Sequence, residues 1–317
     1  MRVLVMAYQD IGYVCLDELL ALGAEVALVV THRDDPHEQV WFRSVAERAC
    51  RSNLPVMAPA FVNQTEVVEA IARLEPDFLF SFYFREILAP ALLALPRRGA
   101  FNLHGSLLPR YRGRCPVNWV LINGERETGV TLHYMEARAD RGDIVGQRAV
   151  SIGDDDTALT LNHKLGAAAR ELLRDVYPLL VAGTASRAPQ DHARATYFGG
   201  RRPEDGRLEW SEPATRLYNL VRAVTQPYPG AFTTCRNKRL LVWWARPLEQ
   251  LEAGGVPGEV LEVRRGHGVV VATGRGALLL ERVQLDGEDV CRADELAGCI
   301  GLLPGERLGP SDRGAAR

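Results

Sequence analysis

The sequence of 317 residues predicts a doubly wound α/β domain followed by a smaller β domain. Short apolar runs alternate with amphipathic helical segments over the first half of the chain, which is typical of a mostly parallel sheet. From residue 184 to residue 206 the composition shifts to Gly, Pro, Arg and Asp, which indicates a linker. Beyond it, short β-like runs separated by Gly-rich turns predict a small barrel.

The first elements follow one another in a regular order. A continuous apolar run at Arg2–Ala7 suits a central parallel strand, and apolar residues at helical spacing predict a helix over Ile11–Leu22. Further strands are expected at 25–31, 77–82 and 100–104, and further helices at 44–51, 65–74 and 90–95. Despite this Rossmann-like beginning, the turn at Tyr8–Gly12 lacks the glycine fingerprint that seats a dinucleotide pyrophosphate. We therefore expect no NAD site.

The later elements are predicted from the same patterns. A helix at Pro116–Ile122 precedes two strands, 127–134 and 143–152, which flank a turn at Asp140. Asp154–Asp156 should open a long helix that ends near Ala182, with its acidic residues at the positive end of the dipole; a metal site is the alternative for these carboxylates. Beyond the linker we expect a helix at 213–224 and strands at 239–244, 258–263, 268–272, 277–283 and near residue 307.

These elements give a predicted domain organisation. Residues 1–183 form the first domain, 184–206 the linker, 207–306 the second domain and 307–317 a tail. The net charge of −2 and the pI near 6.4 give no global electrostatic reason to bind nucleic acid. Six cysteines without Cys-x-x-Cys pairs favour reduced thiols in a cytoplasm and no metal site. No run of about 18 apolar residues occurs, so we expect no membrane insertion.

Two polar residues on one buried strand are the clearest functional signal. Asn102 and His104 point to the same face of the strand at Ala100–His104, because side chains alternate along a strand. Burying such groups without partners would cost about 2–7 kcal/mol. They are either a hydrogen-bonded core pair or a site at the carboxyl end of a strand, where open α/β sheets bind ligands. Asp140 supplies a third group, whereas His133 and His163 are interpreted as structural.

Several motifs, taken together and in order, resemble the folate-dependent formyltransferases. They are the Asn102-x-His104 pair, Ser106–Pro109, Arg112-Gly113 and Asp140-x-Gly142-Asp143. Within that family, further motifs are similar to the members that formylate UDP-4-amino-4-deoxy-L-arabinose: Phe80–Tyr83, Tyr111–Arg114, Asn118–Leu121, Gly129–His133 and Pro229–Phe232. The resemblance covers most of residues 1 to about 300 and implies that the second domain is an oligonucleotide-binding-like barrel.

The resemblance also implies a reaction and the residues that perform it. The formyl donor would be 10-formyltetrahydrofolate, and a neutral amine would attack it through a tetrahedral intermediate that carries oxyanion charge. Asn102 would donate to the oxyanion, His104 would move the proton between the two nitrogens, and Asp140 would orient the imidazole. A non-catalytic scaffold would not need these three residues together.

The family's folate contacts correspond to two segments and one arginine of this chain. The two segments comprise Glu86, Ile87 and Leu88, and Glu136, Ala137, Arg138 and Ala139. Ile87 and Leu88 would otherwise be taken as core residues. Arg114 matches a binding arginine and could face the folate or an anionic acceptor, or it could be a surface residue. Asp143 is either a second acid or a local hydrogen-bond acceptor.

The expected acceptor is UDP-4-amino-4-deoxy-L-arabinose, which would place the protein in lipid A modification and polymyxin resistance. Another amino-sugar nucleotide or a small amine such as hydroxyornithine is the alternative, and water would make the protein a hydrolase. Methionyl-tRNA is disfavoured because the segment Thr31–Glu38 is acid-balanced rather than basic. The chain carries no second dinucleotide fingerprint before Arg317, so formylation alone is expected; the oligomeric state is left open.

Overall fold

The computed structural model describes residues 1–36, 38–249 and 254–309, which form two compact units. The first unit comprises residues 1–117, 126–152 and 160–200. The second comprises residues 118–125, 153–159 and the described residues from 201 onward. Each unit is therefore built from segments that are separate in the sequence.

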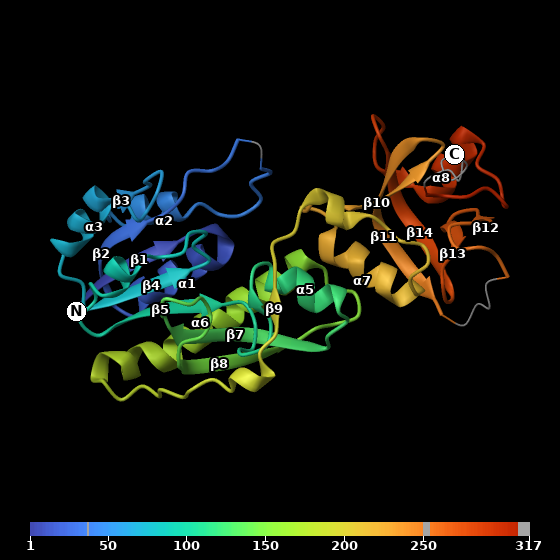
Figure 1. The fold of residues 1–317 in the computed structure, drawn as a ribbon. Coiled ribbons are helices and arrows are strands. Elements are labelled where there is room, and N and C mark those ends of the chain that lie inside the picture. The colour runs from blue at the N-terminus through green and yellow to red at the C-terminus, as the bar shows by residue number, and fades with distance from the viewer. Residues whose placement is uncertain (37, 250–253, 310–317) are drawn as a thin grey trace, which may run out of the picture. The chain divides into compact units, whose positions relative to one another are not determined.

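The first unit contains a seven-stranded sheet (Figure 1). Its strands β1 to β5 are parallel, whereas β7 runs antiparallel to β5 and β8 runs antiparallel to β7. This arrangement confirms the predicted α/β fold with a mostly parallel sheet. In spatial order the strands are β3 (Val56–Met57), β2 (Glu25–Val30), β1 (Arg2–Ala7), β4 (Phe78–Phe82), β5 (Gly99–His104), β7 (Glu127–Tyr134) and β8 (Ile144–Ser151).

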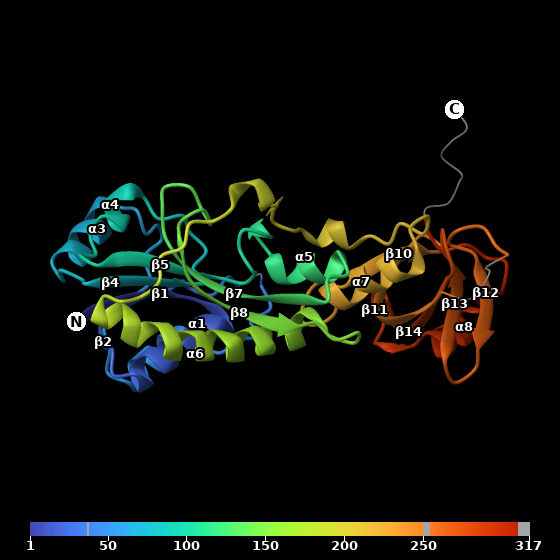
Figure 2. The ribbon, with the colours of Figure 1, turned by 90° about the horizontal axis from the view of Figure 1, so that it is seen from below.

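Helices cover both faces of this sheet, as Figure 2 shows, with α3 and α4 on one side and α1 and α6 on the other. Side chains of one face alternate along the strands, so Leu4 and Met6 of β1 pack with Ile71 of α3 and Leu92 of α4. The helices of the unit are α1 (Gln9–Ala21), α2 (Val45–Arg51), α3 (Thr65–Ala72), α4 (Pro90–Leu93), α5 (Pro116–Ile122) and α6 (Ala158–Ala182), the last two shared with the second unit.

Helix α6 begins later than the sequence predicts. The expected start at Asp154 falls in a turn, because Asp156 accepts a hydrogen bond from the backbone N–H of Gly153 at 2.6 Å. Asp155 instead accepts a hydrogen bond from the hydroxyl of Tyr218 at 3.0 Å. The side chains of Asp155 and Asp156 therefore accept hydrogen bonds from Tyr218 and Gly153, and the helix begins only after them.

Much of the segment predicted as a linker is structured. Strand β9 (Tyr197–Phe198) pairs in parallel with β6 (Arg112–Gly113). Ala188 exchanges two backbone hydrogen bonds with Ile144, at 2.7 and 2.9 Å. We call residues 188–198 the strap, because they run across the loops that follow β5 and β7; the strap includes the short 3-10 helix at His192–Arg194. A second 3-10 turn follows at Pro203–Gly206.

The second unit is an antiparallel β domain, which confirms the predicted change of fold class. In spatial order its strands are β10 (Ala231–Cys235), β11 (Lys238–Leu248), β14 (Ala277–Leu285), β13 (Gly268–Ala272) and β12 (Val260–Arg264), and β15 (Cys291–Arg292) pairs with β14. Two helices accompany them, α7 (Ala214–Val224) and α8 (Ala293–Ile300). Strand β10 and helix α8 are elements that the sequence analysis did not predict.

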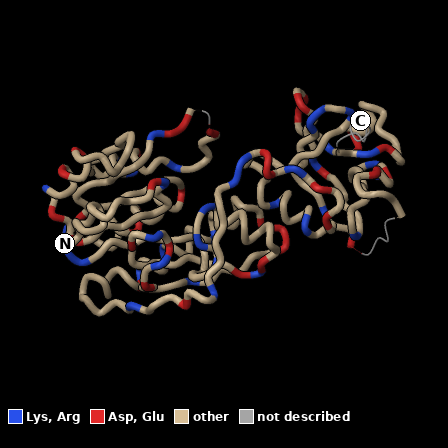
Figure 3. Tube along the Cα trace, viewed as in Figure 1, with Lys and Arg blue, Asp and Glu red and all other residues tan. Residues whose placement is uncertain are grey.

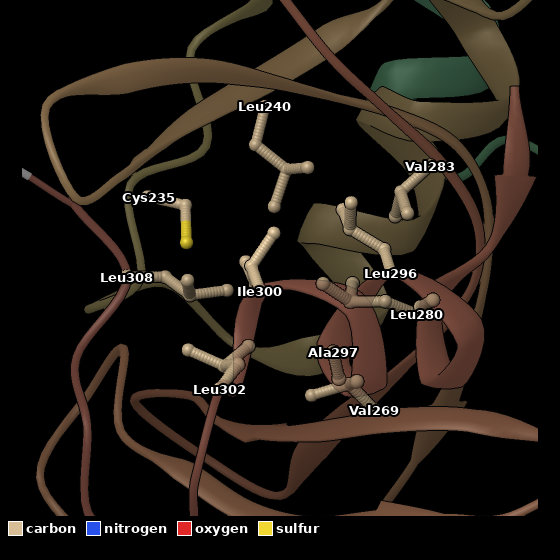
Figure 4. Close-up of a pocket in the computed structure, with 11 residues that line it drawn as sticks. Cys235, Leu240, Val269, Leu280, Val283, Leu296, Ala297, Ile300, Leu302 and Leu308 are labelled. Atoms are coloured by element: carbon tan, nitrogen blue, oxygen red, sulfur yellow. The ribbon is translucent and has the colours of Figure 1, made fainter. Parts of the chain in front are cut away.

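An apolar core joins α8 to the strands of the second unit. Figure 4 shows Leu296 and Ile300 of α8 facing Leu240, Cys235 and Leu308, all of which line one apolar crevice. Leu308 is buried although it belongs to the predicted tail. The rest of that tail, residues 310–317, lies outside the described residues.

Charged residues of both signs are interspersed along the trace (Figure 3), in keeping with the net charge of −2. No helix within the described ranges combines the length and the apolar character that crossing a membrane requires.

Candidate active site

Strand β5 brings the first two predicted site residues to the carboxyl end of the parallel strands. In its antiparallel pairing with β7, Asn102 lies opposite His133 and His104 lies opposite Thr131. Asn102 is half-buried, whereas the side chain of His104 is only 7% exposed. The polar side chains thus collect where β5 meets β7.

His104 is held at both ring nitrogens. Its Nε2 lies 2.7 Å from the backbone carbonyl oxygen of Tyr111, to which it donates. Its Nδ1 lies 3.5 Å from Oδ1 of Asp140. The imidazole therefore lies between the backbone of Tyr111 and the carboxylate of Asp140.

Asp140 lies in the turn between β7 and β8 and adopts a left-handed φ of +58°. Its Oδ2 accepts a hydrogen bond from the backbone N–H of Gly113 at 2.8 Å, which leaves Oδ1 directed at the imidazoles. The turn is tight, because a Cβ on Gly142 would lie 2.0 Å from the carbonyl oxygen of Tyr134. Only glycine fits there, and the carboxylate is therefore placed by backbone geometry.

His133, which the sequence analysis interpreted as structural, lies beside Asn102 and Asp140. Its ring is 1% exposed, Nδ1 donates to the carbonyl of Tyr134 at 2.8 Å, and Nε2 lies 3.2 Å from Nδ2 of Asn102. The same Nε2 is 3.8 Å from Oδ1 of Asp140. Burial lowers the pKa of His133 to about 4, so the ring is neutral at physiological pH. Its place opposite Asn102 depends on strand register, which the sequence alone does not reveal.

A buried arginine network supports the Asp140 turn from the strap. Arg112, which is 1% exposed, donates to Oε1 of Gln190 and to the hydroxyl of Tyr197, the latter at 2.7 Å. Gln190 in turn donates to the carbonyls of Asp140 and Gly142, at 3.1 and 2.7 Å. The network therefore joins the loop after β5 to the loop after β7. None of these contacts was predicted, because their partners are far apart in the sequence.

The predicted folate segment after β4 makes contacts of its own. Leu88 is buried in the core, whereas Ile87 is 74% exposed. Glu86 accepts a hydrogen bond from the backbone N–H of Val62 at 3.0 Å. The structure thus separates Ile87 and Leu88, which the sequence analysis treated alike, and presents Ile87 to solvent. Across the described ranges, no hydrogen bond or ion pair joins Glu86 to the residues around His104.

The other predicted binding residues occupy two loops. Residues 136–139 are exposed and lead directly into Asp140. Arg114 is also exposed, and its backbone N–H donates to Phe198 of the strap at 3.0 Å. Asp143 forms an ion pair with Arg187 at 2.8 Å, a partner 44 residues further along the chain. Among the residues that the structure describes, no group of three or more His, Cys, Asp and Glu side chains has the proximity to hold a metal ion.

Solved structures share this fold at low sequence identity. HypX from Aquifex aeolicus in complex with tetrahydrofolic acid has a TM-score of 0.64 and 19% identity, covering 94% of this chain and 47% of that chain. The chain therefore spans about half the length of HypX. WlaRD, a sugar 3N-formyl transferase solved in the presence of dTDP and 5-N-formyl-THF, has a TM-score of 0.67 and 17% identity, covering 91% of this chain and 99% of that one.

A third structure is the N-formyltransferase from Helicobacter canadensis in complex with folinic acid and dTDP-3-aminofucose. Its TM-score is 0.69 at 18% identity, over 88% of this chain and 98% of that one. The sequence itself matches the formyl transferase family model over residues 4–177 and the formyl transferase C-terminal domain model over residues 201–299. The first match alone covers more than half of the chain. This chain belongs to the formyl transferase family.

Proposed function

We propose that the protein transfers a formyl group from 10-formyltetrahydrofolate to the amine of a nucleotide-linked amino sugar. The observation that carries this proposal is that Asp140 lies beside both His104 and His133 and that His133 contacts Asn102, in a chain of the formyl transferase family. Structural neighbours crystallised with folates and with dTDP or a dTDP-amino sugar support the two substrate classes. The motifs shared with the aminoarabinose enzymes favour UDP-4-amino-4-deoxy-L-arabinose as the acceptor.

The reaction begins when the neutral amine of the sugar attacks the formyl carbon bound to N10 of the folate. A new C–N bond forms, and the formyl oxygen takes the negative charge of the tetrahedral intermediate. An N–H of Asn102 donates to that oxygen, and one such donor is worth about 10²–10³-fold in rate. Asn102 suits this role because it is the more exposed of the two polar residues on β5.

The intermediate collapses when the C–N10 bond breaks and N10 receives a proton. His104 takes the proton from the attacking nitrogen and delivers it to N10, so that the products are the formamide and tetrahydrofolate. Asp140 keeps its place at Nδ1 of His104. For the ring to act as a base, Nε2 must leave the carbonyl of Tyr111 and the ring proton must lie on Nδ1, beside Asp140, so that the lone pair of Nε2 faces the amine.

An acceptor panel tests the proposal. The purified protein is incubated with 10-formyltetrahydrofolate and one amine at a time: UDP-4-amino-4-deoxy-L-arabinose, a dTDP-linked amino sugar, hydroxyornithine or methionyl-tRNA. Formamide formation is followed by mass spectrometry and tetrahydrofolate release by absorbance. We expect the highest kcat/KM with the UDP-amino sugar. Release of tetrahydrofolate without any formylated amine would make the protein a hydrolase, and robust formylation of the tRNA alone would overturn the acceptor class.

Arg114 provides a test of the nucleotide contact. Its guanidinium makes no hydrogen bond or ion pair within the part of the chain that the structure describes, so it can meet the diphosphate of the acceptor. Arg114→Ala should lower kcat/KM for the UDP-amino sugar about 10- to 150-fold more than for the same sugar without UDP. Arg265→Ala, an exposed arginine between β12 and β13, is the matched control. An equal loss on both substrates would assign Arg114 to the folate or to the fold.

A further inference from the structure

Asn102 and His133 face each other across β5 and β7, and within the described ranges His133 is the one hydrogen-bond partner of the Asn102 side chain. We propose that His133 is a positioning residue, whose Nε2 fixes the Asn102 amide so that one N–H remains directed at the formyl oxygen. This inference rests on the proposed formyl transfer and assigns a role to a side chain that the mechanism above does not use.

Hydrogen-bond logic fixes the direction of the contact. Nδ1 of His133 lies 2.8 Å from the carbonyl oxygen of Tyr134, and a carbonyl can only accept, so Nδ1 carries the proton. In the neutral ring Nε2 is then an acceptor, and the atom of Asn102 that lies 3.2 Å away must be the amide nitrogen. One N–H of that nitrogen is used by His133, which leaves the second N–H and the amide oxygen for other partners.

The charges around His133 favour the neutral ring on which this logic depends. Burial is the largest effect and lowers its pKa, and the neighbouring His104 and Arg112 act in the same direction. Asp140 and the carbonyl of Tyr134 raise the pKa of His133, but the net shift is downward. A protonated His133 would lose its acceptor and would present a donor to the amide nitrogen. The amide would then have to rotate and direct its oxygen to the ring.

A histidine that served only to fill the core would not require this partner. His133 already satisfies one ring nitrogen with backbone, and apolar residues such as Val130 and Leu132 fill neighbouring positions of β7. The second nitrogen is instead aimed at a half-buried side chain at the site. An amide that must be complementary to a transition state needs a fixed orientation, and this contact supplies it.

Two variants of one residue separate packing from positioning. His133→Gln can place an acceptor oxygen near the position of Nε2, whereas His133→Asn can keep a donor near Nδ1 but does not reach Asn102. Losing the orienting bond should lower kcat of His133→Asn about tenfold or more at nearly unchanged KM for folate and amine, and His133→Gln should recover most of the loss. Each variant is also made in the Asn102→Ala background, where the His133 substitutions should have little further effect on kcat.

The outcomes distinguish this inference from the proposed function. If the wild type formylates its acceptor and His133→Asn keeps the wild-type kcat, or if the Asn102 and His133 effects multiply independently, the positioning role is overturned. If the wild type transfers no formyl group, the proposed function fails, and the contact is tested by NMR of the imidazole nitrogens. A neutral ring protonated at Nδ1 throughout pH 5.5–8 supports the inference, and an Nε2-protonated or charged ring in that range refutes it.

Discussion

Gln190→Leu should uncouple the strap from the Asp140 turn. Gln190 is 6% exposed, accepts from Arg112 and donates to the carbonyls of Asp140 and Gly142. Leucine fills a similar space but makes none of these bonds. Each buried carbonyl left unsatisfied costs about 1–3 kcal/mol, while Arg112 keeps its other partners. With two such carbonyls we expect a loss of about 2–6 kcal/mol, or about 4–24 °C in Tm for a domain of this size.

The activity of the variant should fall together with its stability, because Asp140 lies in a left-handed conformation that the surrounding bonds maintain. Gln190→Glu is the informative partner. It keeps an oxygen acceptor for Arg112 but has no N–H for the two carbonyls, whose oxygens its charge repels. Glutamate should thus recover part of the Tm but not kcat.

Thermal unfolding and steady-state formyl transfer measure the two effects separately. The rate of formyl transfer by each variant is measured at saturating folate and amine, so that a change in kcat reflects the placement of the catalytic groups rather than substrate binding. If Gln190→Leu unfolded at the wild-type temperature and turned over at the wild-type rate, the strap would have no part in holding the site. If Gln190→Glu regained full kcat, the bond to Arg112 rather than the anchored turn would be the important one.

Two further changes test the site more directly. Replacing Asn102, His104 or Asp140 singly by alanine should lower kcat at least about 10²-fold. Combining the replacements should lower kcat by less than the product of the single effects, since the three groups act in one transition state, and wild-type turnover in a folded His104→Ala protein would contradict this. Gly113→Ala should destabilise the protein by about 1–3 kcal/mol in thermal or chemical unfolding, because its φ is +98° and a Cβ would lie 2.2 Å from the carbonyl oxygen of Phe198. Gly298→Ala, in helix α8 with open space around it, is the control and should be neutral or slightly stabilising.

The parallel sheet was predictable because the sequences of its central strands are short runs of mostly apolar residues. Residues 3–7 of β1 and the four phenylalanine and leucine residues of β4 are almost completely buried, so both faces of these strands are apolar apart from Ser81. The start of α6 was not predictable, because the choice between a helix and a turn at Asp154 depends on the hydrogen-bond donors that Asp155 and Asp156 contact in the folded chain. Helix α8 was missed, although helices of similar or shorter length, such as α5, were predicted.

The candidate site divides in a similar way. Asn102, His104 and Asp140 could be named because their side chains form a motif at fixed spacing. The groups that hold them are different in kind: the carbonyl of Tyr111 and the N–H of Gly113 belong to the backbone, which every residue possesses. His133 could have been selected only by knowing the register of β5 against β7. Sequence patterns therefore identify reacting groups more readily than the groups that orient them.

The strap also bears on the order in which the protein is made. Gln190 is 50 residues beyond Asp140 and 78 residues beyond Arg112, and a chain leaves the ribosome from its N-terminus. Strands β1 to β8 can therefore emerge and pair before the residues that brace the Asp140 turn have been synthesised. During that interval the imidazoles and the carboxylate are present, but the turn between β7 and β8 still lacks Gln190. The nascent chain thus acquires its sheet first and its fully braced site only when the strap has emerged.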